Sequence, residues 1–337
     1  MRRPLLWMLI GATALGALAI RSLTVRSTDE LALPLGTDTR LLVFAPHPDD
    51  EALGTAGLIQ RATAKGASVD VILMTSGDAF SEGVGRAAET TRPTQRDFRN
   101  YGRLREAETR AGMELLGIDR GHIVFLGFPD EGLCLIASNY LSTRTRPFAS
   151  PYTGRAEPPV SEQVIRGISY RGADVRREIE SILIARRPTL IALPHPEDRH
   201  PEHCATSIFV REALEAVATR HAIAPRILSY LIHYERWPEL DEDSGLPLRP
   251  PAAFPAGEGK WRTLTLTAAE ATLKRRVIAA YTSQVEVMGP FVRAFGRPNE
   301  LFLEGQVASP PECWCDETHV ATEAPPERYR RAPAQRR

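Results

Sequence analysis

Short apolar runs alternate with longer amphipathic stretches along most of the 337-residue chain. Residues 41–45 and 189–193 are runs of mostly branched and aliphatic side chains, each followed by a proline, and such runs are typical of buried strands. Residues 51–65, 103–117 and 174–187 show the periodicity of helices. This alternation predicts an α/β fold with a mostly parallel sheet and helices on both faces.

Two stretches without clear periodicity interrupt this pattern. Residues 138–172 contain several Pro, Gly, Ser and Thr residues, and residues 238–259 are polar and rich in Pro. A loop as long as the first one is usually a lid or a binding element of a compact domain, and a disordered insertion is the alternative. We expect one catalytic domain over residues 31–310 with both stretches as loop insertions.

The two ends of the chain differ from this body. Two arginines precede an uncharged stretch over residues 4–20, which indicates that residues 1–30 form a signal peptide or a single membrane anchor. We favour an uncleaved anchor, which would place the body outside the inner membrane; cleavage would make the protein periplasmic or secreted. Residues 311–337 are rich in Pro, Glu and Arg, and we expect a flexible tail.

A histidine and three acidic residues follow the first predicted strand, in the string His47-Pro48-Asp49-Asp50-Glu51. They lie between a strand and a helix, and open α/β sheets bind ligands at this end of their strands. His47 and Asp50 can both turn toward one cation and leave Asp49 free beside it. Because one histidine and one carboxylate do not complete a metal site, a third ligand is required.

The third ligand is expected after the second strand, in the string His200-Pro201-Glu202-His203. Pro201 suits the first position of a helix, and His200 and His203 then lie on one helical face. Either histidine motif alone is compatible with an ordinary turn. Together they predict a His/Asp/His site for one zinc ion, with an open position for water, and leave Asp49 and His200 as acid–base groups.

Both motifs resemble those of the PIG-L/LmbE-like de-N-acetylases, zinc hydrolases that remove acetyl from N-acetylglucosamine-type sugars. Residues 45–51 resemble the first family motif, although Pro46 stands where a single alanine usually precedes the histidine. Residues 200–203 resemble the second, which is normally His-Pro-Asp-His, so Glu202 replaces an aspartate. The resemblance implies an LmbE-like, Rossmann-like fold.

The resemblance also implies roles for single residues. It places zinc on His47, Asp50 and His203 and makes Asp49 the general base. It further implies that His200 stabilises the tetrahedral intermediate, with Glu202 as a supporting residue.

Weaker similarities extend over roughly residues 39–305. The segment from Arg103 to Glu106 resembles the family's Arg-x-x-Glu helix, in which the arginine touches substrate. Residues 125–130 resemble a loop whose aspartate, here Asp130, binds sugar hydroxyls. From the residues alone, Arg103 equally fits a solvated charged helix face, and Asp130 fits a turn.

This chemistry suits amide hydrolysis. Zinc can lower the pKa of a water to about 7 and polarise the acetyl carbonyl. Asp49 would take a proton from that water and later deliver it to the departing amine. His200, as an imidazolium kept charged by Glu51 or Glu202, would stabilise the oxyanion.

Net charge indicates which partners are expected, and the cysteines bear on the compartment of the protein. The chain has 42 basic and 42 acidic side chains, and its arginines are scattered, so a nucleic-acid partner is not expected. Four cysteines are present, and export would permit disulfides, but spacing does not reveal their pairing. On a helix Cys204 would point about 100° away from its histidine neighbour, so we expect it to serve packing.

The sequence therefore predicts a membrane-associated zinc de-N-acetylase acting on an N-acetylated sugar in a glycan or glycolipid. Two alternatives remain open. One keeps the metal and hydrolyses another amide or an ester. The other is a catalytically silent glycan-binding protein at the membrane, which the Glu202 and Pro46 departures permit.

Overall fold

The computed structural model describes most of the chain between residues 28 and 315. The described residues are 28–139, 141, 144–240, 245–254, 259–305, 313 and 315. Within them, eight strands form one sheet in the order β1-β7-β8-β6-β5-β2-β3-β4. Its neighbouring strands are parallel except in the β6–β8 and β7–β8 pairs. The predicted α/β fold with a mostly parallel sheet is confirmed.

The elements follow one another with short connections apart from the two predicted insertions. The strands are β1 (Asp29–Glu30), β2 (Arg40–Ala45), β3 (Ser68–Thr75), β4 (Ile123–Phe128), β5 (Leu190–Pro194), β6 (Arg226–Tyr230), β7 (Lys260–Thr265) and β8 (Asn299–Glu304). The helices are α1 (Asp50–Ala64), α2 (Ser81–Ala87), α3 (Gln95–Leu115), α4 (Leu133–Asn139), α5 (Gly172–Arg186), α6 (Pro201–His221), α7 (Ala268–Ala279) and α8 (Thr282–Arg293).

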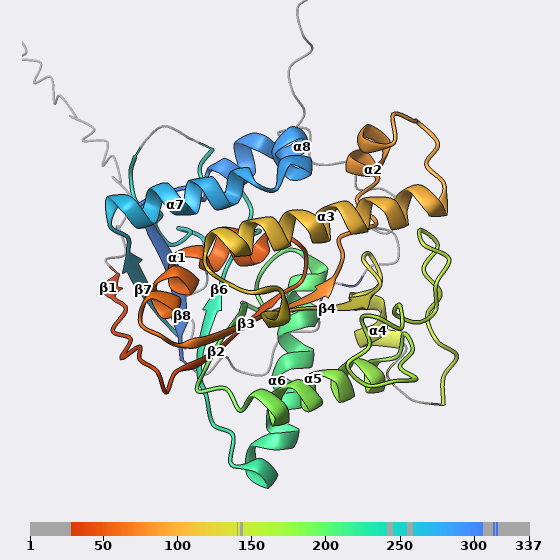
Figure 1. Ribbon diagram of the computed structural model, residues 1–337, viewed down its shortest axis with the longest axis horizontal. Coiled ribbons are helices and arrows are strands. Elements are labelled where there is room, and N and C mark those ends of the chain that lie inside the picture. Colours follow the sequence, from red (N-terminus) through yellow and green to blue (C-terminus); the bar gives the residue numbers. More distant parts are fainter. Residues whose placement is uncertain are drawn as a thin grey trace, which may run out of the picture.

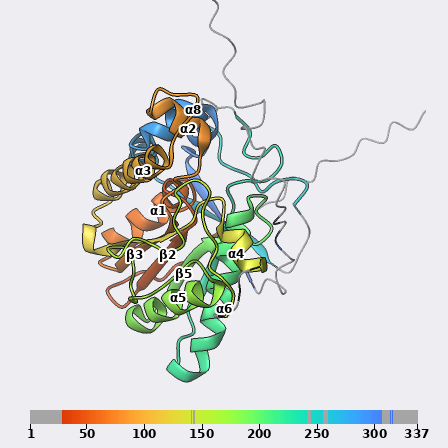
Figure 2. The same ribbon diagram turned by 90° about the vertical axis from the view of Figure 1, so that its right-hand side faces the viewer.

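Alternate side chains of the strands pack against helices on opposite faces of the sheet. In β2, Leu41, Val43 and Ala45 belong to one buried cluster, whereas Leu42 and Phe44 belong to another. Helices α1, α3 and α7 cover the first face, and α5 and α6 cover the second (Figures 1 and 2). Coverage of both faces explains why β2 is apolar at every position from Leu41 to Ala45.

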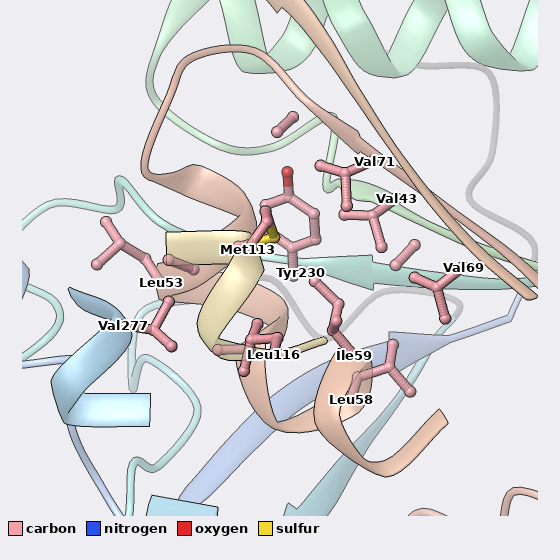
Figure 3. Close-up of a cluster of buried hydrophobic side chains, with 14 of the residues drawn as sticks. Val43, Leu53, Leu58, Ile59, Val69, Val71, Met113, Leu116, Tyr230 and Val277 are labelled. Atoms are coloured by element: carbon pink, nitrogen blue, oxygen red, sulfur yellow. The ribbon is translucent and has the colours of Figure 1, made fainter. Parts of the chain in front are cut away.

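Helix α1, which begins at the two carboxylates of the first motif, is firmly held against the sheet. Leu58 packs in a cluster with Met113 of α3 and Val277 of α7 (Figure 3). The Glu300 carboxylate accepts the N–H groups of Gly57 (2.6 Å) and Leu58 (2.9 Å) and pairs with the buried Lys274 ammonium at 2.8 Å. These contacts hold the middle of α1 against the sheet.

The order of the strands changes direction between β2 and β5. From β2 the chain continues to β3 and β4 on one side, and then returns through β5 to the other side of β2 and continues to β6. Ligands bind in open α/β sheets at such a switch, beyond the carboxyl ends of the strands. Residues 46–49 and 195–200 emerge there next to each other.

The predicted insertions and termini are described only in part. The described residues between α4 and α5, and those of 238–259, form neither helix nor strand. The predicted N-terminal signal or anchor lies outside the described residues except for 28–30, of which two form β1. Of the predicted tail, the structure describes Cys313 and Cys315, and both form disulfides. Among the described residues, no helix has the length and apolar character needed to cross a bilayer.

Candidate functional site

The structure brings His47, Asp50 and His203 together at the switch between β2 and β5. Asp50 is the first residue of α1, and Pro201 begins α6 as predicted. The Asp50 Oδ2 atom lies 3.2 Å from His47 Nδ1 and 3.1 Å from His203 Nε2. The two imidazole centroids are 5.5 Å apart. One carboxylate oxygen thus faces a nitrogen from each of two distant motifs.

This arrangement fits a bound cation. His203 is fully buried, yet neither ring nitrogen makes a hydrogen bond in acceptable geometry within the described structure. Ligand atoms about 2.1 Å from a tetrahedral ion lie about 3.4 Å from one another, and the two distances at Asp50 Oδ2 are close to this value. Within the described residues, the groups whose ligand atoms all lie within 4.8 Å of one another are His47 with His200 and His203, Asp50 with His203 and His233, and His47 with Asp130 and Glu202. Burial disfavours the imidazolium, but the carboxylates of Asp198 and Asp50 raise the pKa of His203 to about 9. The pocket therefore favours positive charge, and two histidines with a carboxylate form a donor set typical of zinc.

Asp198 supports His203 from behind. Its Oδ2 atom lies 3.2 Å from His203 Nδ1 and accepts the N–H groups of Ile232 (2.8 Å) and His233 (3.1 Å). A carboxylate behind a ligating imidazole fixes the ring and its tautomer. No role for Asp198 was predicted from the sequence. The signal that could have revealed it is its position, as an acidic residue in the short segment between β5 and α6.

Asp49 lies beside the donor set in a strained backbone conformation. It precedes α1 with a φ of 126°, a backbone angle that residues other than glycine rarely adopt. The Asp49 N–H donates to Glu51 Oε2 at 3.1 Å, and Glu51 Oε1 accepts the Tyr281 hydroxyl at 2.5 Å. Burial raises the pKa of Asp49 to about 8, against the opposing effect of the Arg105 guanidinium. Backbone strain together with a raised carboxyl pKa is common in acid–base groups at functional sites.

A different arginine from the predicted one reaches this carboxylate. Arg103 is exposed on α3 and bonds to Asn100, so its predicted contact with substrate gains no support. Arg105 is buried, donates to the Pro48 carbonyl at 2.6 Å, and lies 3.4 Å from Asp49 Oδ1. Two residues along a helix rotate the side chain by about 200°, which explains why one arginine points outward and the other inward.

His200 lies between the imidazoles of the two motifs. Its ring centroid is 4.7 Å from that of His47 and 5.0 Å from that of His203. Its Nδ1 accepts the Glu202 N–H at 3.3 Å, so the ring proton belongs on Nε2. Burial, together with the neighbouring His47 and His203, lowers the pKa of His200 well below its usual value. His200 is thus a neutral N–H donor in this structure, not the imidazolium that we expected.

The side-chain carboxylate of Glu202 contacts His47, and only the backbone N–H of Glu202 contacts the His200 ring. Its Oε2 atom lies 2.7 Å from His47 Nε2, and its Oε1 accepts the N–H groups of Gly132 (3.2 Å) and Leu133 (3.0 Å). Glu51 is also directed elsewhere, toward Tyr281. Neither of the two carboxylates that we expected to keep His200 charged therefore contacts its ring. The Glu202 carboxylate joins the start of α4 to His47, one of the predicted metal ligands.

Asp130 reaches the site from the loop after β4. Its Oδ1 lies 3.3 Å from His47 Nε2, and its Oδ2 accepts the Ala79 N–H at 2.6 Å. The structure thus places Asp130 at the back of His47. Binding of sugar hydroxyls by this residue stays a prediction.

Shortening Glu202 is expected to weaken the site. In Glu202→Asp one methylene is lost, so the carboxylate no longer spans the distance between His47 and the Gly132 and Leu133 amides. We expect kcat/KM for the proposed reaction to fall about 10-fold to 100-fold, as for other residues behind metal ligands. Kinetics with metal analysis would check this, with Glu202→Gln as the length-matched control. An increase in activity would instead support the catalytically silent alternative.

His233 is a further histidine near these residues, and no role was predicted for it from the sequence. It follows β6, and its ring centroid lies 5.0 Å from that of His203 and 5.1 Å from that of His200. It stacks on Phe291 at 5.2 Å. Asp50, His203 and His233 offer ligand atoms within 4.8 Å of one another. The signal that could have revealed His233 is its position just beyond the end of a third parallel strand, β6.

Comparisons with known proteins found similar deacetylases. A relative from Actinosynnema mirum, named 1D-myo-inositol 2-acetamido-2-deoxy-alpha-D-glucopyranoside deacetylase, is 28% identical over 273 residues, which cover 76% of this chain and 84% of the relative. A solved deacetylase of teicoplanin biosynthesis superposes with a TM-score of 0.51 at 17% identity, covering 79% of this chain and 97% of that one. The A40926 pseudoaglycone deacetylase superposes with a TM-score of 0.50 at 19% identity, covering 79% and 96%. At these identities the two structures show a shared fold.

A sequence model of one family matches residues 42–214, which is just over half of the chain. The matched region contains both histidine motifs, the buried Arg105 and the Asp130 loop. The chain therefore belongs to the PIG-L family, which is described as GlcNAc-PI de-N-acetylase.

Proposed function

We propose that this protein is a zinc-dependent hydrolase that removes acetyl from an N-acetylated sugar of the N-acetylglucosamine type. The observation that carries the proposal is the strained Asp49 carboxylate beside the buried donor set of His47, Asp50 and His203. The family model and the Actinosynnema relative, whose name specifies a 2-acetamido sugar, support the substrate class.

The residues of the chain divide the work of amide hydrolysis. A zinc ion held by His47, Asp50 and His203 would supply a lowered water pKa, about 7, and Lewis acidity toward the acetyl carbonyl. Asp49 accepts the proton of the attacking water and afterwards delivers it to the departing sugar amine. His200 donates its Nε2–H to the oxygen on which negative charge develops.

Arg105 and Glu51 hold Asp49 in place for this task. The guanidinium approaches its carboxylate, and the Glu51 carboxylate accepts its backbone N–H. Since Asp49 lies in an unfavourable φ region, these contacts are required to keep its carboxylate directed at the site. A proton acceptor must lie within hydrogen-bond reach of the water that it activates.

The proposal extends to the location of the substrate. The N-terminal arginines and the uncharged stretch after them are typical of a signal or anchor segment. Two disulfides in the described structure support export, because such bonds persist in oxidising compartments. We therefore place the enzyme outside the cytoplasmic membrane, retained by its N-terminal segment, with a glycan or glycolipid as substrate.

Acetate release tests the proposed reaction. The zinc-loaded protein is expected to release acetate and a free amine from N-acetylglucosamine glycosides, and much less acetate from acetyl esters and N-acetyl peptides. Acetate and amine assays would be run in parallel on the three substrate classes, with the metal-free protein as control. Turnover of esters or peptides alone would contradict the sugar assignment, and a folded, loaded protein without any turnover would contradict hydrolysis.

A further inference from the structure

Two disulfides join the C-terminal part of the chain to two helices of the site. Cys134 in α4 is bonded to Cys315, and Cys204 in α6 is bonded to Cys313. The bonded pairs have Cα separations of 5.5 and 5.7 Å. The Cys315 N–H donates to the Cys313 carbonyl at 2.7 Å, so the two cysteines form a tight turn. Cys204 is therefore a covalent attachment point and not only the packing residue that we expected.

Each attachment point adjoins a residue of the site. Cys204 directly follows His203, one of the three proposed metal ligands. Cys134 directly follows Leu133, whose N–H donates with that of Gly132 to Glu202 Oε1. The other oxygen of Glu202 lies against His47 Nε2. The two disulfides thus connect, through the turn at 313–315, the helix of a metal ligand with the helix next to the Asp130 loop.

We propose that the turn at 313–315 and its two disulfides form a covalent clip that positions residues 130–133 against Glu202 and His47. The clip acts through these residues, so Cys134, Cys204, Cys313 and Cys315 are positioning residues. The kinetic part of this inference rests on the proposed function. The structural part stands on the contacts alone.

Helix α4 needs such support because it is short and isolated in the chain. It has only seven residues, and helices of that length are not stable by themselves. On its C-terminal side, the described residues up to α5 form neither helix nor strand. Helix α4 packs on α6, and its Leu133 and Ile136 side chains are buried. Its C-terminal end at Ser138 and Asn139 is exposed, and an exposed end favours local opening. A cross-link reduces the number of open conformations and so lowers the entropy gained on opening.

The arrangement predicts an unusual pattern of effects. One disulfide alone ties the turn to a single helix and does not connect the helices. Removing either disulfide therefore breaks the covalent connection between α4 and α6 as completely as removing both. The effects on the site are expected to be non-additive, as for groups that act as one unit.

Three variants test this pattern. They are Cys134→Ser with Cys315→Ser, Cys204→Ser with Cys313→Ser, and the replacement of all four cysteines. We expect all three to raise KM for an N-acetylglucosamine glycoside by a similar factor, about ten-fold. Zinc content and kcat are expected to change little, because the metal ligands lie on β2–α1 and α6. Hydrogen exchange at the Gly132 and Leu133 amides is expected to become faster in all three.

A reversible treatment guards against loss of folding in the variants. The zinc-loaded wild-type protein would be reduced with dithiothreitol, assayed, reoxidised and assayed again. Reduction is expected to raise KM and to speed exchange at the same two amides, and reoxidation is expected to reverse both. The four-serine variant is the matched control, because the reductant has no disulfide to act on in it.

Four outcomes separate this inference from its alternatives. If one pair of serines leaves KM and amide exchange unchanged, or if the two pairs act additively, the clip is wrong. A lower melting temperature without either change would mean that the disulfides only anchor the tail, which also overturns the clip. Faster amide exchange in a protein that never releases acetate would retain the clip and reject the proposed function.

Discussion

Asp49→Asn is expected to lower kcat for acetate release by about 10²-fold to 10⁴-fold, the usual contribution of a positioned acid–base group. Asparagine cannot accept the proton of the attacking water, but it has nearly the same shape. It also tolerates positive φ better than most residues, so it is suited to the φ of 126° at this position. The fold and the ion are expected to be retained.

Single-turnover and steady-state kinetics, together with metal analysis, would measure this effect. Asp119→Asn serves as the control, because this aspartate is exposed and lies outside the site. Turnover by Asp49→Asn within two-fold of wild type, at equal zinc content, would remove Asp49 from the mechanism. Loss of zinc in the variant would mean that Asp49 also supports the ion.

His203→Ala is expected to abolish binding of the ion and to destabilise the fold. The imidazole lies between the carboxylates of Asp50 and Asp198, at 3.1 and 3.2 Å, and is fully buried. Without it, two buried carboxylates face an empty space. Removal of one partner from a buried charged arrangement costs about 3–5 kcal/mol of unfolding free energy.

Urea unfolding and mass-spectrometric metal analysis would measure both effects. Unfolding of wild type and variant would be compared in the presence of a chelator, so that the loss of the ion does not enter the difference. His122→Ala is the control: this histidine also pairs with a buried aspartate, Asp70, but is itself partly exposed, so its loss should cost at most about 1 kcal/mol. Full zinc content in His203→Ala would exclude His203 as a ligand.

The fold could be predicted well because its signals are local. The runs at 41–45 and 189–193 became β2 and β5, and Pro201 begins α6. A strand buried on both faces must be apolar at each position, so the sequence carries its own evidence. The side chains that follow such strands then meet at one edge of the sheet. This rule predicted from the sequence that His47, Asp50 and His203 lie close together.

The remaining site residues could not be predicted in the same way. Arg103 and Arg105 have similar local sequence surroundings, and only the rotation of α3 against the sheet directs Arg105 to Asp49. Glu202 had been expected to face His200, but the neighbouring start of α4 offers two N–H groups that draw its carboxylate toward His47. The Asp198 carboxylate is held against His203 by N–H groups just beyond a distant strand end, those of Ile232 and His233.

The sequence by itself determined the alternation of strands and helices and the donor types of the proposed metal site, because periodicity and motif spacing act over a few residues. Only the tertiary structure decided which arginine approaches the base, which acid lies behind the first histidine, and which cysteines pair. Those choices depend on the rotation and packing of segments that are far apart in the chain. The interaction energies that determine them exist only when these segments are packed against one another.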